Sequence, residues 1–142
     1  MSDKTDAFEN DVINHVFRNT SLGLDVSNVW IALCTSAPGS PGNMAATEIT
    51  LAEHAEYARI ALARTGPGFQ AAIGGVTATA LNATWAAMVS GTGGTATHVA
   101  IFKGSVIATN DAIYTRAAGT PRVFSLGKIL QIDAGALTIT ES

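Results

Sequence analysis

The first clear pattern along the chain is helical. Phe8, Val12, Ile13, Val16 and Phe17 recur at spacings that place them on one face of a helix with 3.6 residues per turn. This pattern predicts an amphipathic helix over residues 5–22. Because its apolar face needs cover from water, we expect the helix to plug an open end or face of the remaining fold.

Polar residues at both ends support the same helix. Asp6 is suited to cap the start, with Glu9 three residues further on, and both acids lie near the positive end of the helix dipole. Arg18 lies near the negative end. Gly23 is suited to a left-handed cap at the end.

Short apolar segments separated by turn-forming residues follow the helix. They predict strands over 28–35 and 57–64, one or two strands within 74–88, and a β-hairpin in which residues 106–109 return after a turn at 103–105. Two more strands are expected within 112–126, broken at 118–121, and two within 128–140, joined by a turn at 133–135. Residues 47–56 fit either a short helix or a loop.

About eight short strands without intervening helices indicate a mainly β fold. We expect one domain over residues 1–142, in which the helix precedes a single β-sandwich at 28–142, with a jelly-roll-like or Greek-key arrangement. Trp30, Trp85, Phe102 and Phe124 fall on predicted strands and are expected to anchor its core.

The low content of charge changes the picture of the surface. Charged residues make up 13 % of the chain, against about 25 % in typical soluble domains. Other subunits are therefore expected to cover much of the surface, although a stable monomer is an open alternative. The net charge of −3, with Lys and Arg spread along the chain, argues against a nucleic-acid partner. No segment approaches the length of a membrane span, so no membrane partner is expected.

The candidate chemistry is sparse. His15, His54 and His98 lack metal-ligand spacing, and the cluster of Glu53, His54 and Glu56 is more simply explained as the solvated face of a short helix. We therefore predict no catalytic residues, no metal, no cofactor and no enzymatic activity. A small cell-wall hydrolase is only a remote alternative, because such an enzyme requires paired carboxylates or a metal triad, and the sparse candidate residues do not supply either.

Cys34 is the single cysteine of the chain and lies within an apolar predicted strand. A thiol in that position is expected to behave as a small buried apolar group and not as a nucleophile. A lone cysteine and an acidic N-terminal stretch without an apolar core also fit synthesis in a reducing cytoplasm.

Several stretches together carry a resemblance. "AFENDVINHVFRNTSLGL", "YARIALAR", "GTATHVAIFKG" and "DAGALTIT", in this order, resemble a family of small tailed-bacteriophage virion proteins described as tail-fibre-like or as capsid decoration (cement) proteins. The resemblance covers nearly the whole chain and is loosest over residues 103–130. It implies a helix followed by a β-sandwich, synthesis in a bacterial host, a place in the virion, and no catalytic residues.

The resemblance implies two structural roles. The favoured one is a capsid decoration protein on the capsid surface, a homo-oligomer (a trimer favoured) that binds the major capsid protein and stabilises the assembled shell by mass action. The alternative is a tail, tail-fibre or baseplate component that contacts other tail proteins and possesses host-binding loops.

The loops at 36–46 and 66–70 are predicted to contact the partner, because proline preorganises them and Met44 and Phe69 offer apolar anchors. Their candidate contact residues are Pro38, Pro41, Met44, Pro67 and Phe69.

Overall fold

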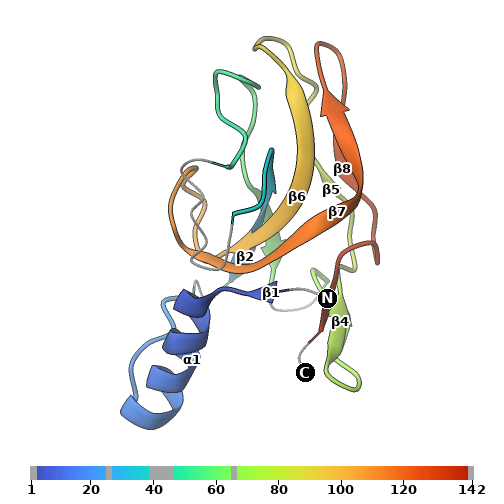
Figure 1. Cartoon of the computed structure of the whole chain (residues 1–142). Helices are drawn as coiled ribbons and strands as arrows, with labels where there is room; N and C mark the ends of the chain where they lie inside the picture. The colour runs from blue at the N-terminus through green and yellow to red at the C-terminus, as the bar shows by residue number, and fades with distance from the viewer. Residues whose placement is uncertain (1–2, 25–26, 39–46, 65–66, 141–142) are drawn as a thin grey trace.

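The computed structural model describes residues 3–24, 27–38, 47–64 and 67–140, and it is mainly β with one N-terminal helix (Figure 1). The strands are β1 (Asp3–Lys4), β2 (Asn28–Cys34), β3 (Ile60–Ala63), β4 (Val76–Ala78), β5 (Ala83–Thr84), β6 (Gly94–Phe102), β7 (Ala112–Phe124), β8 (Gln131–Ile132) and β9 (Thr138–Thr140). The helix α1 spans Asp6–Arg18. The predicted fold class is confirmed.

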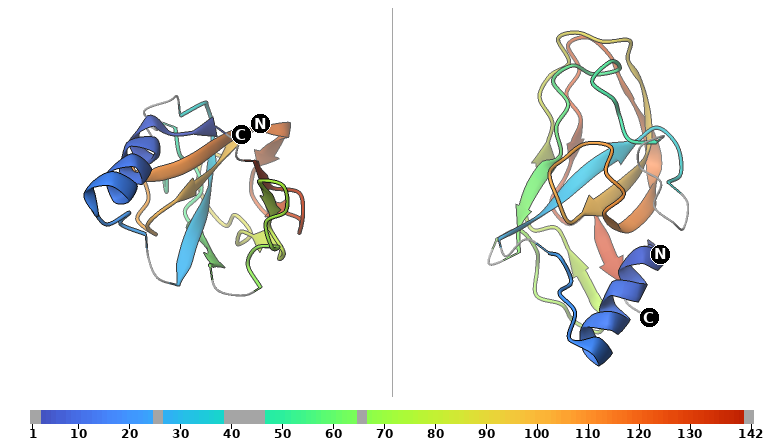
Figure 2. Two further views of the ribbon diagram at one scale, coloured as in Figure 1. Left: turned by 90° about the horizontal axis from the view of Figure 1, so that it is seen from below. Right: turned by 90° about the vertical axis from the view of Figure 1, so that its left-hand side faces the viewer.

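The strands form three antiparallel sheets. A five-stranded sheet has the order β1-β7-β6-β2-β3, and two small ribbons pair β4 with β9 and β5 with β8. The long, curved strands β6 and β7 form the middle of the large sheet, and the ribbons lie across from it (Figures 1 and 2).

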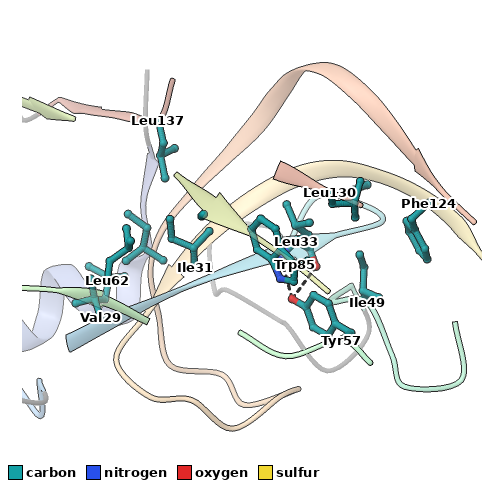
Figure 3. Close-up of a cluster of buried hydrophobic side chains, with 14 of the residues drawn as sticks. Val29, Ile31, Leu33, Ile49, Tyr57, Leu62, Trp85, Phe124, Leu130 and Leu137 are labelled. Atoms are coloured by element: carbon teal, nitrogen blue, oxygen red, sulfur yellow. Dashed lines mark hydrogen bonds between the residues drawn. The ribbon is translucent and has the colours of Figure 1, made fainter. Parts of the chain in front are cut away.

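The main core fills the space between the large sheet and the ribbons. Ile31 and Leu33 project into it from the large sheet, and Trp85 and Leu130 project from the opposite side (Figure 3). The hydroxyl of Tyr57 crosses this layer and meets the backbone of Leu33, whose N–H donates to it at 2.9 Å. Burial of these apolar side chains is the main stabilising contribution to the sheet packing.

A second, smaller cluster lies on the other face of the large sheet. It contains Phe102, Cys34 and three alanines, with Trp30 partly buried beside it. Trp85, Phe102 and Phe124 are fully buried, so these three aromatic residues anchor the core as predicted.

The connection between β6 and β7 differs from the predicted hairpin. Residues 106–109 form no strand, and the chain instead makes a nine-residue loop, 103–111, before β7 begins at Ala112. The physical reason is a buried charge network, described below, that holds this loop against residues 47–59.

Strand β7 is continuous where two strands were predicted. Ala96 pairs with Arg122 and His98 with Ala117, so the four residues 118–121 stand opposite the single residue Thr97. The turn-forming sequence is thus absorbed as a bulge, which sharpens the local twist without ending the strand. Strand β3 is also shorter than predicted and begins only at Ile60.

Candidate interaction surface and the network behind it

Helix α1 is attached to the sheet only at its first half. Thr5, not Asp6, is the N-cap: its hydroxyl accepts from the Phe8 N–H at 3.3 Å and donates to the Ala112 carbonyl at 2.6 Å. Phe8 is the one buried residue of the helix, and its ring lies 5.9 Å from that of Tyr114. These contacts fix the start of α1 to strand β7.

An ion pair holds the second turn of α1. The Lys103 ammonium contacts the carboxylate of Asp11, and the same ammonium lies 5.9 Å from the centre of the Phe8 ring. Beyond this point the helix extends away from the sheets (Figure 2). It ends at Asn19, which is the left-handed cap; Gly23, the predicted cap, is also left-handed (φ 66°) but lies four residues further along the chain.

The remaining apolar face of α1 is open to solvent. Relative exposure rises along it, from 37 % at Val12 and 56 % at Ile13 to 64 % at Val16 and 81 % at Phe17. The expectation that this face plugs the sandwich is therefore wrong. The physical reason is that Thr5, Phe8 and Asp11 tie only the first half of α1 to strand β7 and Lys103, so only Phe8 reaches the core and the rest of the face is left uncovered. We call Val12, Ile13, Val16 and Phe17 the α1 apolar face.

The residues predicted to contact a partner differ from one another in burial. Pro38 is buried, Pro67 is exposed, and Phe69 is half-buried and packs against the main core. Pro41 and Met44 lie outside the described residues. The contact role of all five residues stays a prediction.

A buried charge network lies on the second face of the large sheet. Glu48 and Arg59 are almost fully buried and form a two-point ion pair, with both nitrogen-to-oxygen distances at 2.9 Å. A second carboxylate, Asp111, accepts from Arg59 at 3.1 Å. The Arg59 guanidinium also stacks 3.6 Å from the centre of the Phe102 ring.

The network satisfies all five N–H groups of Arg59. Besides the two carboxylates, the guanidinium donates to the carbonyls of Gly104 and Thr109, and Glu48 in turn accepts from the Ala108 N–H at 2.7 Å. Burial alone lowers the pKa of Arg59, but the hydrogen bonds to Glu48 and Asp111 outweigh it and hold the pKa above its usual value. Arg59 therefore remains charged and pins loop 103–111.

Sequence reasoning missed this network. Arg59 falls within the strand predicted over 57–64, and nothing near it in sequence points to Asp111, which lies 52 positions away. The available signal was a lone arginine between Tyr57 and Ile60, in a segment otherwise suited to burial, since a buried arginine requires paired acids.

The cluster of Glu53, His54 and Glu56 is not a solvated helix face. Glu53 caps a turn by accepting from the Thr50 N–H at 2.8 Å, whereas His54 is completely buried. His54 Nδ1 lies 3.6 Å from a Glu56 oxygen, and neither ring nitrogen has a hydrogen-bond partner among the described residues. Glu56 itself accepts from the Val89 N–H, which lowers its pKa.

The single cysteine behaves as predicted. Burial of Cys34, reinforced by the nearby carboxylate of Glu48, raises the pKa of its thiol to about 12. The thiolate needed for nucleophilic attack is therefore scarce at neutral pH. Within the described ranges, no three His, Cys, Asp or Glu side chains gather in a way that could hold a metal ion. No helix in the same part of the chain has the length and apolar character needed to cross a membrane.

Residues 3–140 match the sequence profile of a family described as podophage GP4 fiber I protein gp80. The chain belongs to this family. The resemblance to tailed-phage virion proteins is thereby confirmed, and the chain is a phage structural protein of the virion. No curated protein matches the chain.

Proposed function

We propose that the chain is a structural subunit of a phage fibre and that it acts through protein contacts and not through catalysis. The observation that carries the proposal is the family match, which spans residues 3–140 and therefore the entire described fold. The family's description names a fibre, so it favours the tail-fibre alternative over the capsid decoration role that the sequence analysis preferred. The burial of Cys34 and His54 within the core also fits a chain without a reactive centre.

The α1 apolar face is the contact surface that we assign to this role, and its occupant is a second copy of the chain. The four side chains expose roughly 300–400 Å² of apolar area, which is about half of what one partner contributes to a standard interface. The face has no formal charge, so two such faces can meet without burying an unpaired ion. The predicted trimer is one arrangement that joins them.

A pair of lysine variants tests the contact surface. Val16 and Val106 are both 64 % exposed, but only Val16 belongs to the α1 apolar face. Val16→Lys is expected to shift sedimentation of the purified chain towards the monomer, while Val106→Lys leaves the oligomer intact. Lysine also suits the end of a helix, so α1 should still form. A wild-type chain that remains monomeric at high concentration would overturn the assignment.

The fibre role is tested on virions. Gold-labelled antibodies raised against the purified chain are expected to decorate fibres in electron micrographs. Label confined to the icosahedral shell would support the capsid decoration role and reject the proposal.

A further inference from the structure

A cavity separates the bulged half of β7 from the segment that includes β8. Its volume is about 360 Å³, at the lower end of the range for small-molecule sites, which is about 300–1,000 Å³. Its floor is apolar and consists of buried side chains from the main core: Leu33, Trp85, Leu130 and Leu137. A site of this size suits one small ring and not an extended chain.

The register of β6 and β7 places two arginines over this floor. Arg116 pairs with Val99 and Arg122 pairs with Ala96, and both partners pack into the main core. Directly paired residues project from the same face of a sheet, so both arginines lie on the inner face, and both line the cavity. The bulge between them includes Gly119, which leaves room beside the guanidinium groups.

The two arginines differ in what they already bind. The Arg116 guanidinium is held by Thr138, donating to its hydroxyl at 2.7 Å and to its carbonyl at 3.2 Å. Arg122 is exposed and has no ion-pair partner among the described residues. One guanidinium is thus positioned by the fold and the other is available to a ligand.

The opposite wall offers hydrogen-bonding groups. The Gln131 amide donates to an Asp133 carboxylate oxygen at 2.6 Å, and both residues line the cavity. Trp85 also lines it, and its buried indole N–H has no acceptor in the described part of the chain. Arg116, Arg122 and Asp133 together give the lining a formal charge of +1, in a chain whose net charge is −3.

We propose that this cavity binds a hydroxylated carboxylate the size of one monosaccharide, such as a uronic acid. The guanidinium groups match the geometry of a carboxylate, Asp133 and Gln131 match hydroxyl groups, and the apolar floor packs against the C–H face of the ring. The proposal goes beyond the fibre role and does not depend on it.

Titration of the purified chain with D-galacturonate tests the site, with tryptophan fluorescence as the readout because Trp85 lines the cavity. Saturable binding is expected, and Arg122→Ala should weaken it about tenfold or more through the loss of charge-assisted hydrogen bonds. Arg18→Ala removes the same charge from exposed helix α1 and should leave the affinity unchanged.

Two further ligands test whether the site recognises both the carboxylate and the hydroxylated ring. D-galactose, which lacks the carboxylate, is expected to bind at least tenfold more weakly than D-galacturonate. Acetate is expected to bind more weakly still, because it lacks the ring and hydroxyls. No saturable binding of D-galacturonate, equal binding of acetate, or an Arg122→Ala variant with unchanged affinity would each overturn the assignment.

Discussion

The buried pair of Glu48 and Arg59 allows the most quantitative prediction. In Arg59→Met, a side chain of similar length keeps the contact with Phe102, but Glu48 remains buried without its cation. Removing one partner of a buried ion pair costs about 3–5 kcal/mol, because the remaining charge loses both water and its counter-ion. For a chain of 142 residues this corresponds to a fall in melting temperature of roughly 10–15 °C.

The double variant Glu48→Gln/Arg59→Met distinguishes the interaction between the two charges from the packing of each side chain. It removes the unpaired carboxylate, so it is expected to be at least as stable as Arg59→Met alone. The resulting coupling free energy should be about 2 kcal/mol or more. Urea unfolding followed by tryptophan fluorescence gives the free energy of unfolding of the wild type, the two single variants and the double variant.

Local opening of loop 103–111 can be measured in addition to the overall stability. Arg59 and Glu48 hold loop 103–111 through Gly104 and Ala108, so Arg59→Met should speed trypsin cleavage after Lys103 in the native state. Arg18→Met, at an exposed position, should change stability by less than about 0.5 kcal/mol. A loss below about 1 kcal/mol in Arg59→Met, or fully additive effects in the double variant, would refute the view that this network stabilises the loop.

Three other outcomes are expected. Cys34, with a thiol pKa of about 12, should react with a disulfide reagent only upon unfolding; rapid labelling of the native chain would contradict its burial. Glu56→Gln should lower the melting temperature at neutral pH, since the native pKa of Glu56 is lowered by the Val89 N–H; this difference should shrink as the pH falls below 4.5, and a constant difference would exclude the pKa effect. Phe69→Ala should lower the free energy of unfolding by about 1–2 kcal/mol, because the ring packs against the main core; unchanged stability would instead support Phe69 as a contact residue.

Local patterns in the sequence were sufficient for much of the fold. The apolar spacing predicted α1, and the segment around Ile31 and Leu33 predicted β2 to within one residue of its observed end. These elements depend on interactions between residues close in sequence, so their patterns can be recognised without the tertiary structure.

Contacts between residues far apart in the sequence determine the structural features that local sequence patterns did not predict. Loop 103–111 replaces a predicted strand because Arg59 bonds across 52 positions to Asp111. The bulge in β7 brings Arg116 and Arg122 opposite Val99 and Ala96, which are only three positions apart on β6. Such pairings depend on the assembled sheet, which no short window of sequence contains.

The α1 apolar face shows the limit of a different inference. Its amphipathic pattern was read correctly, but an apolar face shows that a surface needs cover and not which molecule provides it. In this chain α1 contributes only Phe8 to the main core, so Val16 and Phe17 remain exposed.

A cryo-electron microscopy map of the phage fibre tests the central claim most directly. The account predicts that the described fold fits repeated densities in the fibre, with the α1 apolar faces of neighbouring copies in contact. A fibre map without this fold, or one in which Phe17 of every copy faces solvent, would contradict it.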